Sequence, residues 1–192
     1  MSNTSATGGP LLPASTPAPL EGEALQNFFH DWFVGLTGYP PQMVRPRWQP
    51  EPANIPQNNV NWLAFGIPRR ESDTYAAEVH VPSGSGYNEI RRHQTLNIAL
   101  SFYGPDADSF AGILRDGVQV AQNREILALN NMGLLETTET ITAPELVKDK
   151  WYYRVDMTVR IRRQIVRQYA VESLQSGHVG LDNEIYTTEI NV

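Results

Sequence analysis

The sequence of 192 residues contains no cysteine. This absence excludes disulfide bonds, thiolate catalysis and every zinc or iron–sulfur site that depends on cysteine. The sequence also has no apolar run close to the roughly 18 residues that a membrane-spanning helix needs. Its N-terminus lacks the basic and apolar segments of a signal peptide. We therefore expect a soluble, non-secreted protein.

Lysine is scarce: the 15 basic residues include only Lys148 and Lys150, and the rest are arginine. The net charge of -6 argues against a protein that coats nucleic acid with its whole surface. Arginine is favoured at protein–protein contacts, because its planar guanidinium forms bidentate hydrogen bonds and stacks on aromatic rings. The composition therefore favours protein partners.

The N-terminal half divides into a tail, a helix and an arm. Residues 1–20 are mostly Ser, Thr, Ala, Gly and Pro without charge, which predicts a disordered tail. Apolar residues at spacings of three and four predict a helix over 21–36, with Gly35 and Gly38 as stop signals. Residues 39–56 carry six prolines, which exclude a helix or a central strand. Because this arm also holds large apolar side chains, we expect it to lie extended along a surface.

Alternating apolar residues predict strands over 59–67, 75–81 and 90–102. Gly104-Pro105-Asp106 predicts the start of a helix, followed by a second helical turn over 123–131 and a short strand over 134–141. The hairpin register that keeps the apolar side chains on one face pairs Val81 with Ile90, Glu78 with His93, and His80 with Arg91.

The strongest strand prediction covers residues 150–166. One face carries Trp151, Tyr153, Val155 and the alternate apolar residues up to Ile161, and the other face is polar and rich in arginine. This pattern predicts one face on a core and one on water, a ligand or a subunit contact. Residues 171–192 hold four acids and no Lys or Arg, and 185–192 is a final strand or a second arm.

The order of elements predicts a single α+β domain. An antiparallel or mixed β-sheet carries helices on one face over residues 21–170, including the Pro-rich arm at 39–56. The disordered tail at 1–20 precedes it, and an acidic C-terminal arm at 171–192 follows it.

An enzyme would have to use the histidines and nearby acids. Glu78, His80 and His93 could hold a metal ion in principle, but the simpler interpretation is an ion pair between Glu78 and His93 on a solvated face. The sequence has no GxSxG elbow, phosphate-binding loop or GxGxxG fingerprint. Asp106 and Asp108 fit the charge preference of a helix N-terminus. We predict no catalytic activity, metal or cofactor.

Residues 150–167 carry six basic residues against one acid. Nucleic-acid binding calls for aromatic side chains on the same face, and only Tyr152 qualifies. The favoured alternative pairs these arginines with the acidic tail residues, within the chain or across a subunit contact. Contact with the backbone of passing DNA is the minor alternative. The tail acids concerned are Glu172, Asp182, Glu184 and Glu189.

Four strings in the sequence form a specific set. The first is Tyr-Pro-Pro-Gln-Met-Val-Arg-Pro-Arg-Trp-Gln-Pro at residues 39–50. The other three are Ser101-Phe102-Tyr103-Gly104, then 115–119 with 122–125, then Trp151 with 154–156 and 161–163. In order and spacing, these strings resemble the neck and tail terminator proteins of tailed bacteriophages, and the resemblance runs from about residue 23 to residue 170.

The resemblance implies a virion protein that is assembled in the bacterial host cytoplasm. Such proteins are small α/β subunits of a hexameric ring at the head-proximal end of the tail tube. The implied partners are further copies of the chain, the tail tube protein, a head-completion, stopper or collar protein, and the sheath in contractile tails. DNA would pass the lumen without sequence-specific binding. The candidate contact residues are Met43, Arg45, Arg47, Trp48, Arg154, Asp156, Arg160, Arg162 and Arg163.

Two alternatives stay open at this point, the second of them from a different class of protein. One is a related structural role, as a head–tail connector, a stopper or a tube subunit. The other is a metal-dependent enzyme that uses Glu78, His80 and His93. A tube subunit polymerises by itself, whereas a terminator stops at one ring, and an enzyme would bind metal.

Overall fold

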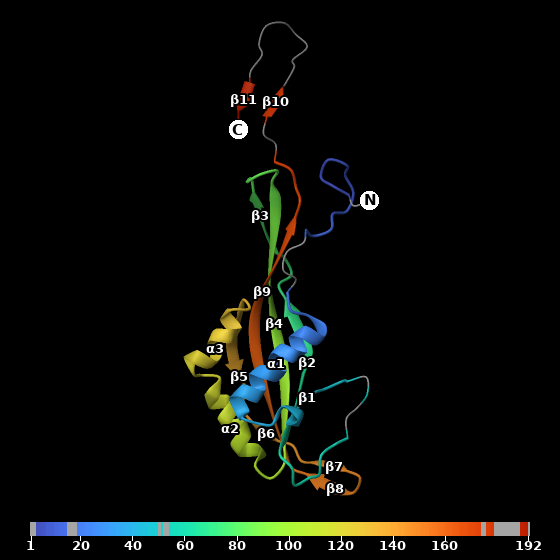
Figure 1. The fold of residues 1–192 in the computed structure, drawn as a ribbon, viewed down its shortest axis with the longest axis vertical. Coiled ribbons are helices and arrows are strands. Elements are labelled where there is room, and N and C mark those ends of the chain that lie inside the picture. Colours follow the sequence, from blue (N-terminus) through green and yellow to red (C-terminus); the bar gives the residue numbers. More distant parts are fainter. Residues whose placement is uncertain are drawn as a thin grey trace. The chain divides into compact units, whose positions relative to one another are not determined.

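The computed structural model describes residues 3–14, 19–49, 51, 54–173, 176–178 and 189–191, the last two as backbone only. Among these residues, none of the helices is long and apolar enough to cross a membrane. The elements, labelled in Figure 1, are α1 (Gly22–Thr37), η1 (Pro41–Met43), β1 (Val44–Pro46), β2 (Trp62–Ser72), β3 (Ala77–Val81), β4 (Tyr87–Tyr103), α2 (Ala107–Gly117), α3 (Ala121–Ala128), β5 (Met132–Thr137), β6 (Ile141–Thr142), β7 (Glu145–Val147), β8 (Lys150–Tyr152), β9 (Arg154–Tyr169), β10 (Ser176–His178) and β11 (Glu189–Asn191).

The chain divides into two compact units, and the larger one comprises Pro19–Thr74 and Arg92–Ile165. The main sheet has the strand order β1-β2-β4-β9-β5, with β3 paired to β4 and β6 paired to β9. β1 runs parallel to β2, and the other pairs for which the register is defined are antiparallel. Together with the three α-helices, this mixed sheet confirms the predicted α+β class.

Helix α1 forms because its apolar residues recur on one stripe, and that stripe packs on the sheet. Leu25, Phe29 and Phe33 are fully buried, and Phe33 meets Phe65 of β2 edge to face at 5.3 Å. The helix ends at Gly38, whose left-handed φ of 71° lets its N–H donate to the Val34 carbonyl. The predicted helix and the stop signal at Gly38 are confirmed, whereas Gly35, the other predicted stop signal, lies inside the helix.

Helices α2 and α3 complete the cover of one sheet face, the face toward α1 (Figure 1). They contribute Ala111, Leu114 and Leu127 to the core, each with no exposed surface. The prediction that Gly104-Pro105-Asp106 starts a helix is confirmed, with Asp106 at the N-cap of α2. From the strands, the buried side chains of the same cluster are Val44, Leu63, Phe65, Leu96, Ile98, Leu100, Phe102, Met132, Val155, Met157, Val159 and Ile161.

The Pro-rich arm is extended but not free of secondary structure. It begins with the short 3-10 turn η1, which corrects the prediction that it contains no helix. Pro41 suits the first position of such a turn because the missing N–H has no partner there in any case. The arm then adds β1 to the edge of the sheet, where Pro46 interrupts no central hydrogen-bond ladder.

The long strand predicted over 150–166 is interrupted. Tyr153 separates β8 from β9, and its carbonyl accepts a hydrogen bond from Gly104 instead of from a neighbouring strand. β8 turns away to pair with β7. Trp151 and Tyr153 were therefore wrongly placed on the core face: they are 66% and 38% exposed. Alternation alone could not reveal the break because the apolar pattern continues through it.

The smaller unit combines residues 1–18, 75–91 and 166–192. Its β3–β4 hairpin pairs Val81 with Tyr87 and Glu78 with Ile90, so the predicted register is wrong by three residues. The reason is that the loop between β3 and β4 is shorter than predicted. Gly84 and Gly86 make this tight turn possible by adopting left-handed φ values of 65° and 89°.

At the C-terminal end, β10 pairs with β11 in antiparallel fashion. The final strand or arm predicted over 185–192 thus contains β11, while 185–188 and 192 lie outside the described residues. In the N-terminal segment, the Ala14 N–H donates to the Gln168 carbonyl at 2.6 Å. Disorder of the whole segment 1–20 stays a prediction.

Candidate interaction surface

The two faces of β9 differ because successive side chains point to opposite sides of the sheet. From Val155 to Ile165 every second residue is buried toward the helices. The alternate side chains lie on the face that none of the described helices covers. The predicted contact residues on this open face are Arg154, Asp156, Arg160 and Arg162.

Arg154 lies between two carboxylates. Its Nη1 is 2.8 Å from Glu145 Oε2, and its Nη2 is 3.0 Å from Asp156 Oδ2. Burial lowers the pKa of Arg154, but the charge of Asp156 and the hydrogen bonds to Tyr103 and Glu145 outweigh it and raise the pKa above its ordinary value. The guanidinium therefore stays charged and ties β9 to β7.

Arg160 and Arg162 continue the row of charges. Arg160 Nη1 lies 2.6 Å from Glu136 Oε1, and this hydrogen bond raises the pKa of Arg160. Arg162 Nη2 lies 3.7 Å from Asp73 Oδ2. Such partly exposed ion pairs contribute little to stability, so they remain available to exchange partners when another surface approaches.

These contacts bear on the predicted pairing with the acidic tail. The arginines of β9 take their described carboxylate partners from β9 itself (Asp156), from other strands (Glu71, Glu136 and Glu145), from Asp73 after β2 and from Glu21 before α1. The side chains of three tail acids, Asp182, Glu184 and Glu189, lie outside the described residues. Pairing with the tail across a subunit contact stays a prediction.

Ser101 links the Pro-rich arm to the centre of the open face. Its hydroxyl accepts a hydrogen bond from Arg47 and donates one to Asp156. Ser101 is only 2% exposed. Arg47 is thereby held flat against β4 and β9, which explains how an arm rich in proline keeps a defined position.

Aromatic rings gather at the end of the open face where β2 begins. Trp62 and Tyr103 are opposite each other in the register of β2 and β4, and their rings stack at 4.2 Å with only 5° between the planes. The guanidinium carbon of Arg45 lies 5.7 Å from the centre of the Trp62 ring, a cation–π distance.

Trp48 is held in an unusual conformation at the same place. Its φ of 59° lies in the left-handed region, which costs a bulky residue roughly 1 kcal/mol or more. Its side chain is nevertheless 68% exposed. A strained backbone that presents a large aromatic ring to solvent is typical of a functional contact.

These residues line an open pocket of about 420 Å³, here called the arm pocket. The arm pocket is lined by Arg45, Pro46, Arg47, Trp48, Gln49, Ile55, Trp62, Ala64 and Tyr103. Three of the predicted contact residues are therefore brought together. Ile55, Trp62 and Tyr103 were not among the predicted contact residues, although Trp62 within the predicted strand 59–67 and Tyr103 directly after the predicted strand 90–102 were a usable signal.

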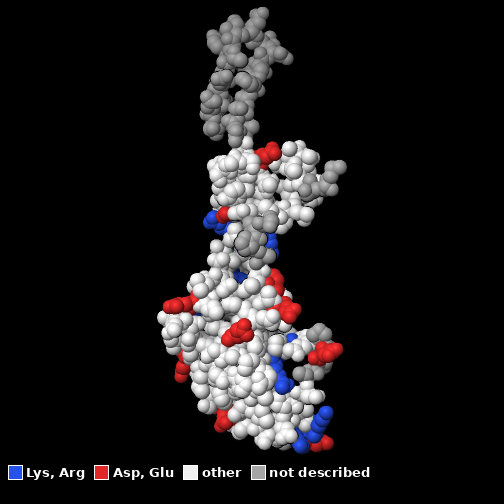
Figure 2. All heavy atoms as spheres, viewed as in Figure 1, with Lys and Arg blue, Asp and Glu red and all other residues white. Residues whose placement is uncertain are grey.

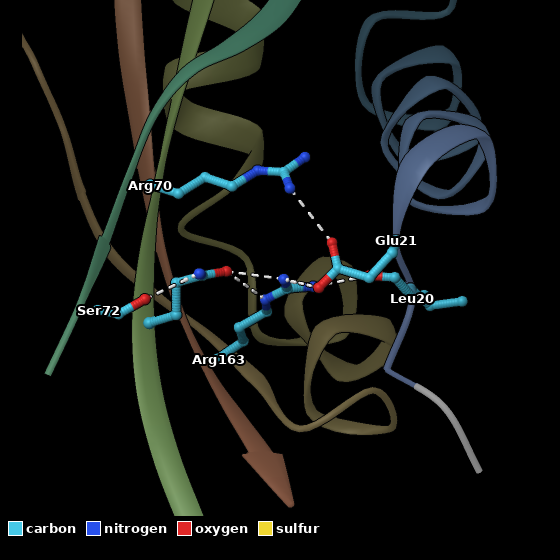
Figure 3. A network of polar contacts seen from close by, with 6 residues as sticks. Leu20, Glu21, Arg70, Ser72 and Arg163 are labelled. Atoms are coloured by element: carbon cyan, nitrogen blue, oxygen red, sulfur yellow. Dashed lines mark hydrogen bonds and ion pairs between the residues drawn. The ribbon is translucent and has the colours of Figure 1, made fainter. Parts of the chain in front are cut away.

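Arg163 was wrongly grouped with the contact residues. It is 2% exposed and belongs to the helix-covered side of β9 (Figure 3). Its guanidinium donates to the Leu20 carbonyl at 2.6 Å, to Glu21 Oε1 at 2.6 Å and to Gln94 Oε1 at 2.7 Å. Arg70 donates to the other oxygen of Glu21 at 3.2 Å. Arg163 thus fixes the chain where it enters α1.

Met43 also has an internal role, since it is partly buried and packs against the core cluster. The remaining predicted contact residues share the open face: Arg45, Arg47, Trp48, Arg154, Asp156, Arg160 and Arg162. On the face toward which α1 lies, Figure 2 shows acidic and basic side chains scattered over the surface.

The candidate metal ligands do not converge. Within the part of the chain that the structure describes, no three His, Asp or Glu side chains gather as a metal site requires. His80 Nδ1 lies 2.6 Å from Asn88 Oδ1, and Asn88 also donates to Glu78. His93 instead lies 3.6 Å from Asp73, so the predicted Glu78–His93 pair is wrong.

The fold and the open face together define an α+β subunit suited to contacts with other proteins. A family model described as phage neck terminator protein matches residues 23–185, and the chain belongs to this family. Its members are structural components of the virion neck and not enzymes, which confirms the resemblance found in the sequence. No curated protein matches the sequence.

Proposed function

We propose that the chain terminates the tail tube. Copies of it form a closed ring, of six subunits as in the tail terminators that it resembles, at the head-proximal end of the tube. The ring stops tube polymerisation and joins the tail to the neck. Membership of the phage neck terminator family supports the general role.

One observation supports assembly through the open face. Seven of the predicted contact residues share that face, and they combine exchangeable ion pairs with the exposed ring of Trp48. Protein interfaces are rich in tryptophan and arginine, and the same physical reasons apply here. Tryptophan buries a large apolar area, and arginine forms bidentate hydrogen bonds and stacks on aromatic rings.

The partners follow from this position in the virion. They are the tail tube protein on one side and a head-completion, stopper or collar protein on the other, with the sheath as a further neighbour in contractile tails. The chain's net charge of -6 suits a channel through which DNA slides, because like charges prevent adhesion. Assembly takes place in the bacterial host cytoplasm.

Native mass spectrometry tests the proposal. The purified chain and its mixture with the phage's tail tube protein are compared. A closed ring, or a monomer that joins tube ends as one ring, supports a terminator. Long polymers of this chain alone indicate a tube subunit. A monomer that ignores tubes but binds the portal side of isolated heads indicates a connector or stopper.

A further inference from the structure

The arm pocket contains two arginines for which the described part of the chain supplies no acidic partner. Among the described residues, neither Arg45 nor Arg47 has a carboxylate within the 4.0 Å that defines a salt bridge. In the described part of the chain, Arg45 donates to the carbonyls of Gln42 and Asn54, at 3.0 and 2.6 Å. Four arginines of β9, by contrast, each have a carboxylate oxygen within 3.9 Å: Arg154, Arg160, Arg162 and Arg163.

The walls of the arm pocket are apolar and open. Trp48 and Ile55 are 68% and 53% exposed, and the stacked pair of Trp62 and Tyr103 lies beside them. Two guanidinium groups next to aromatic and aliphatic walls form a site for a segment that carries carboxylates beside apolar side chains. A volume of about 420 Å³ accommodates a few such side chains.

The chain itself contains a segment with this chemistry. Residues 181–186 read Leu-Asp-Asn-Glu-Ile-Tyr, which places two acids among three large apolar side chains. The whole stretch 171–192 contains no Lys or Arg. The segment lies in the connection between β10 and β11. Its charge and its apolar content both complement the arm pocket.

We propose that residues 181–186 of one copy bind the arm pocket of a neighbouring copy. Asp182 and Glu184 then pair with Arg45 and Arg47, and the adjacent apolar side chains cover Trp48 and Ile55. A closed ring needs a heterologous contact, in which each subunit offers two different surfaces. A pocket and an acidic arm supply them. The inference deepens the proposed ring and rests on it.

Introduced cysteines test the contact directly, because the chain has none of its own. Gln49→Cys lies in the lining of the arm pocket, and Asn183→Cys lies between the two acids. After mild oxidation, the double variant should run as a ladder of covalent oligomers on a non-reducing gel. Each single variant should remain monomeric there. A bridge confined within one chain, or no bridge in an assembled ring, would overturn the proposal.

Charge reversal provides an independent test that avoids the folded core. Asp182→Arg with Glu184→Arg should weaken ring assembly at least about tenfold in midpoint concentration. Adding Arg45→Glu to this variant should restore part of the loss. The matched control is Asp116→Arg with Glu125→Arg, the same charge change at exposed positions of α2 and α3, which should assemble normally.

The outcomes separate the two proposals. If the unaltered chain forms no ring, alone or on tubes, the proposed function fails and the docking proposal fails with it. If the unaltered chain forms rings and both the reversed-charge arm and the cysteine pair leave them unaffected, the ring stands and the docking proposal alone is overturned.

Discussion

The indole ring of Trp48 lies directly over Gly66. A β-carbon at residue 66 would come within 2.6 Å of Trp48 Cζ3, which is closer than real contacts allow. Gly66 belongs to β2, so its missing side chain leaves the space on the open face into which the ring fits. The position of Trp48, and with it one wall of the arm pocket, depends on a glycine in the neighbouring strand.

Gly66→Ala should displace the Trp48 ring and impair assembly. Because the ring is mostly exposed, it can move aside, and the monomer should lose less than about 1 kcal/mol of unfolding free energy. Ring assembly, measured by light scattering against concentration, should weaken about tenfold or more. Trp48→Ala should have the same effect on assembly.

The double variant is the control for this pair of residues. Once Trp48 is Ala, the added methyl group at residue 66 meets no ring, so the two effects should not add. Additive losses of assembly would mean that Gly66 acts by another route. Unchanged assembly in Trp48→Ala would mean that the arm serves only its own subunit.

Arg163 should matter for stability and not for assembly. Arg163→Lys keeps the charge but loses the fork that reaches Leu20, Glu21 and Gln94 together, so the unfolding free energy should fall by about 1–3 kcal/mol. The neighbouring Arg162→Lys is the matched control on the opposite face, with an expected change within about 0.5 kcal/mol. Chemical denaturation measures both, and equal losses would contradict the assignment.

The same network sets how much of the N-terminus can be removed. Deletion of residues 1–18 should leave the thermal midpoint of the larger unit unchanged. Deletion of residues 1–21 removes Leu20 and Glu21, two hydrogen-bond partners of the buried Arg163 guanidinium. The thermal midpoint should then fall by several degrees, which corresponds to a loss of about 2–4 kcal/mol in unfolding free energy. Equal midpoints for the two truncations would show that Arg163 finds other partners.

The hydrogen bonds of the Glu89 carboxylate predict that the folded protein loses stability in acid. Its pKa lies below the ordinary value because Arg91 and Gln168 donate hydrogen bonds to its carboxylate. A lowered folded-state pKa stabilises the fold above the unfolded-state pKa, and this contribution is lost as the pH falls through the folded-state value.

Glu89→Gln should therefore flatten the decline of the thermal midpoint from neutral to acidic pH. Glu125→Gln, an exposed change on α3, should leave that decline as it is. Circular dichroism melts across the pH range measure both. Identical profiles for Glu89→Gln and the unaltered chain would contradict this role of Glu89.

The sequence predicts most of the fold through periodicity. The buried stripe of α1 and the alternation from Val155 to Ile161 depend on local spacing, and both are confirmed. The same alternation placed Arg154, Asp156, Arg160 and Arg162 on one polar face. These are consequences of backbone geometry, which short stretches of sequence reveal.

Features that depend on loop geometry or on contacts distant in sequence could not be predicted in this way. The hairpin register depends on how tightly the loop at Gly84 and Gly86 closes, and alternation tolerates several registers. Arg163 lies on the buried, otherwise apolar face of β9 because Leu20 and Glu21, which are distant in sequence, accept its hydrogen bonds. The break at Tyr153 likewise depends on Gly104.

The central claim is that this chain ends tube growth as a ring, and electron microscopy of tube assembly tests it most directly. Tail tube protein is polymerised with increasing amounts of the chain, and tube lengths and tube ends are recorded. The account predicts shorter tubes, each with one ring at one end and none along its length. Tubes of unchanged length, or the chain incorporated along the tube wall, would contradict it.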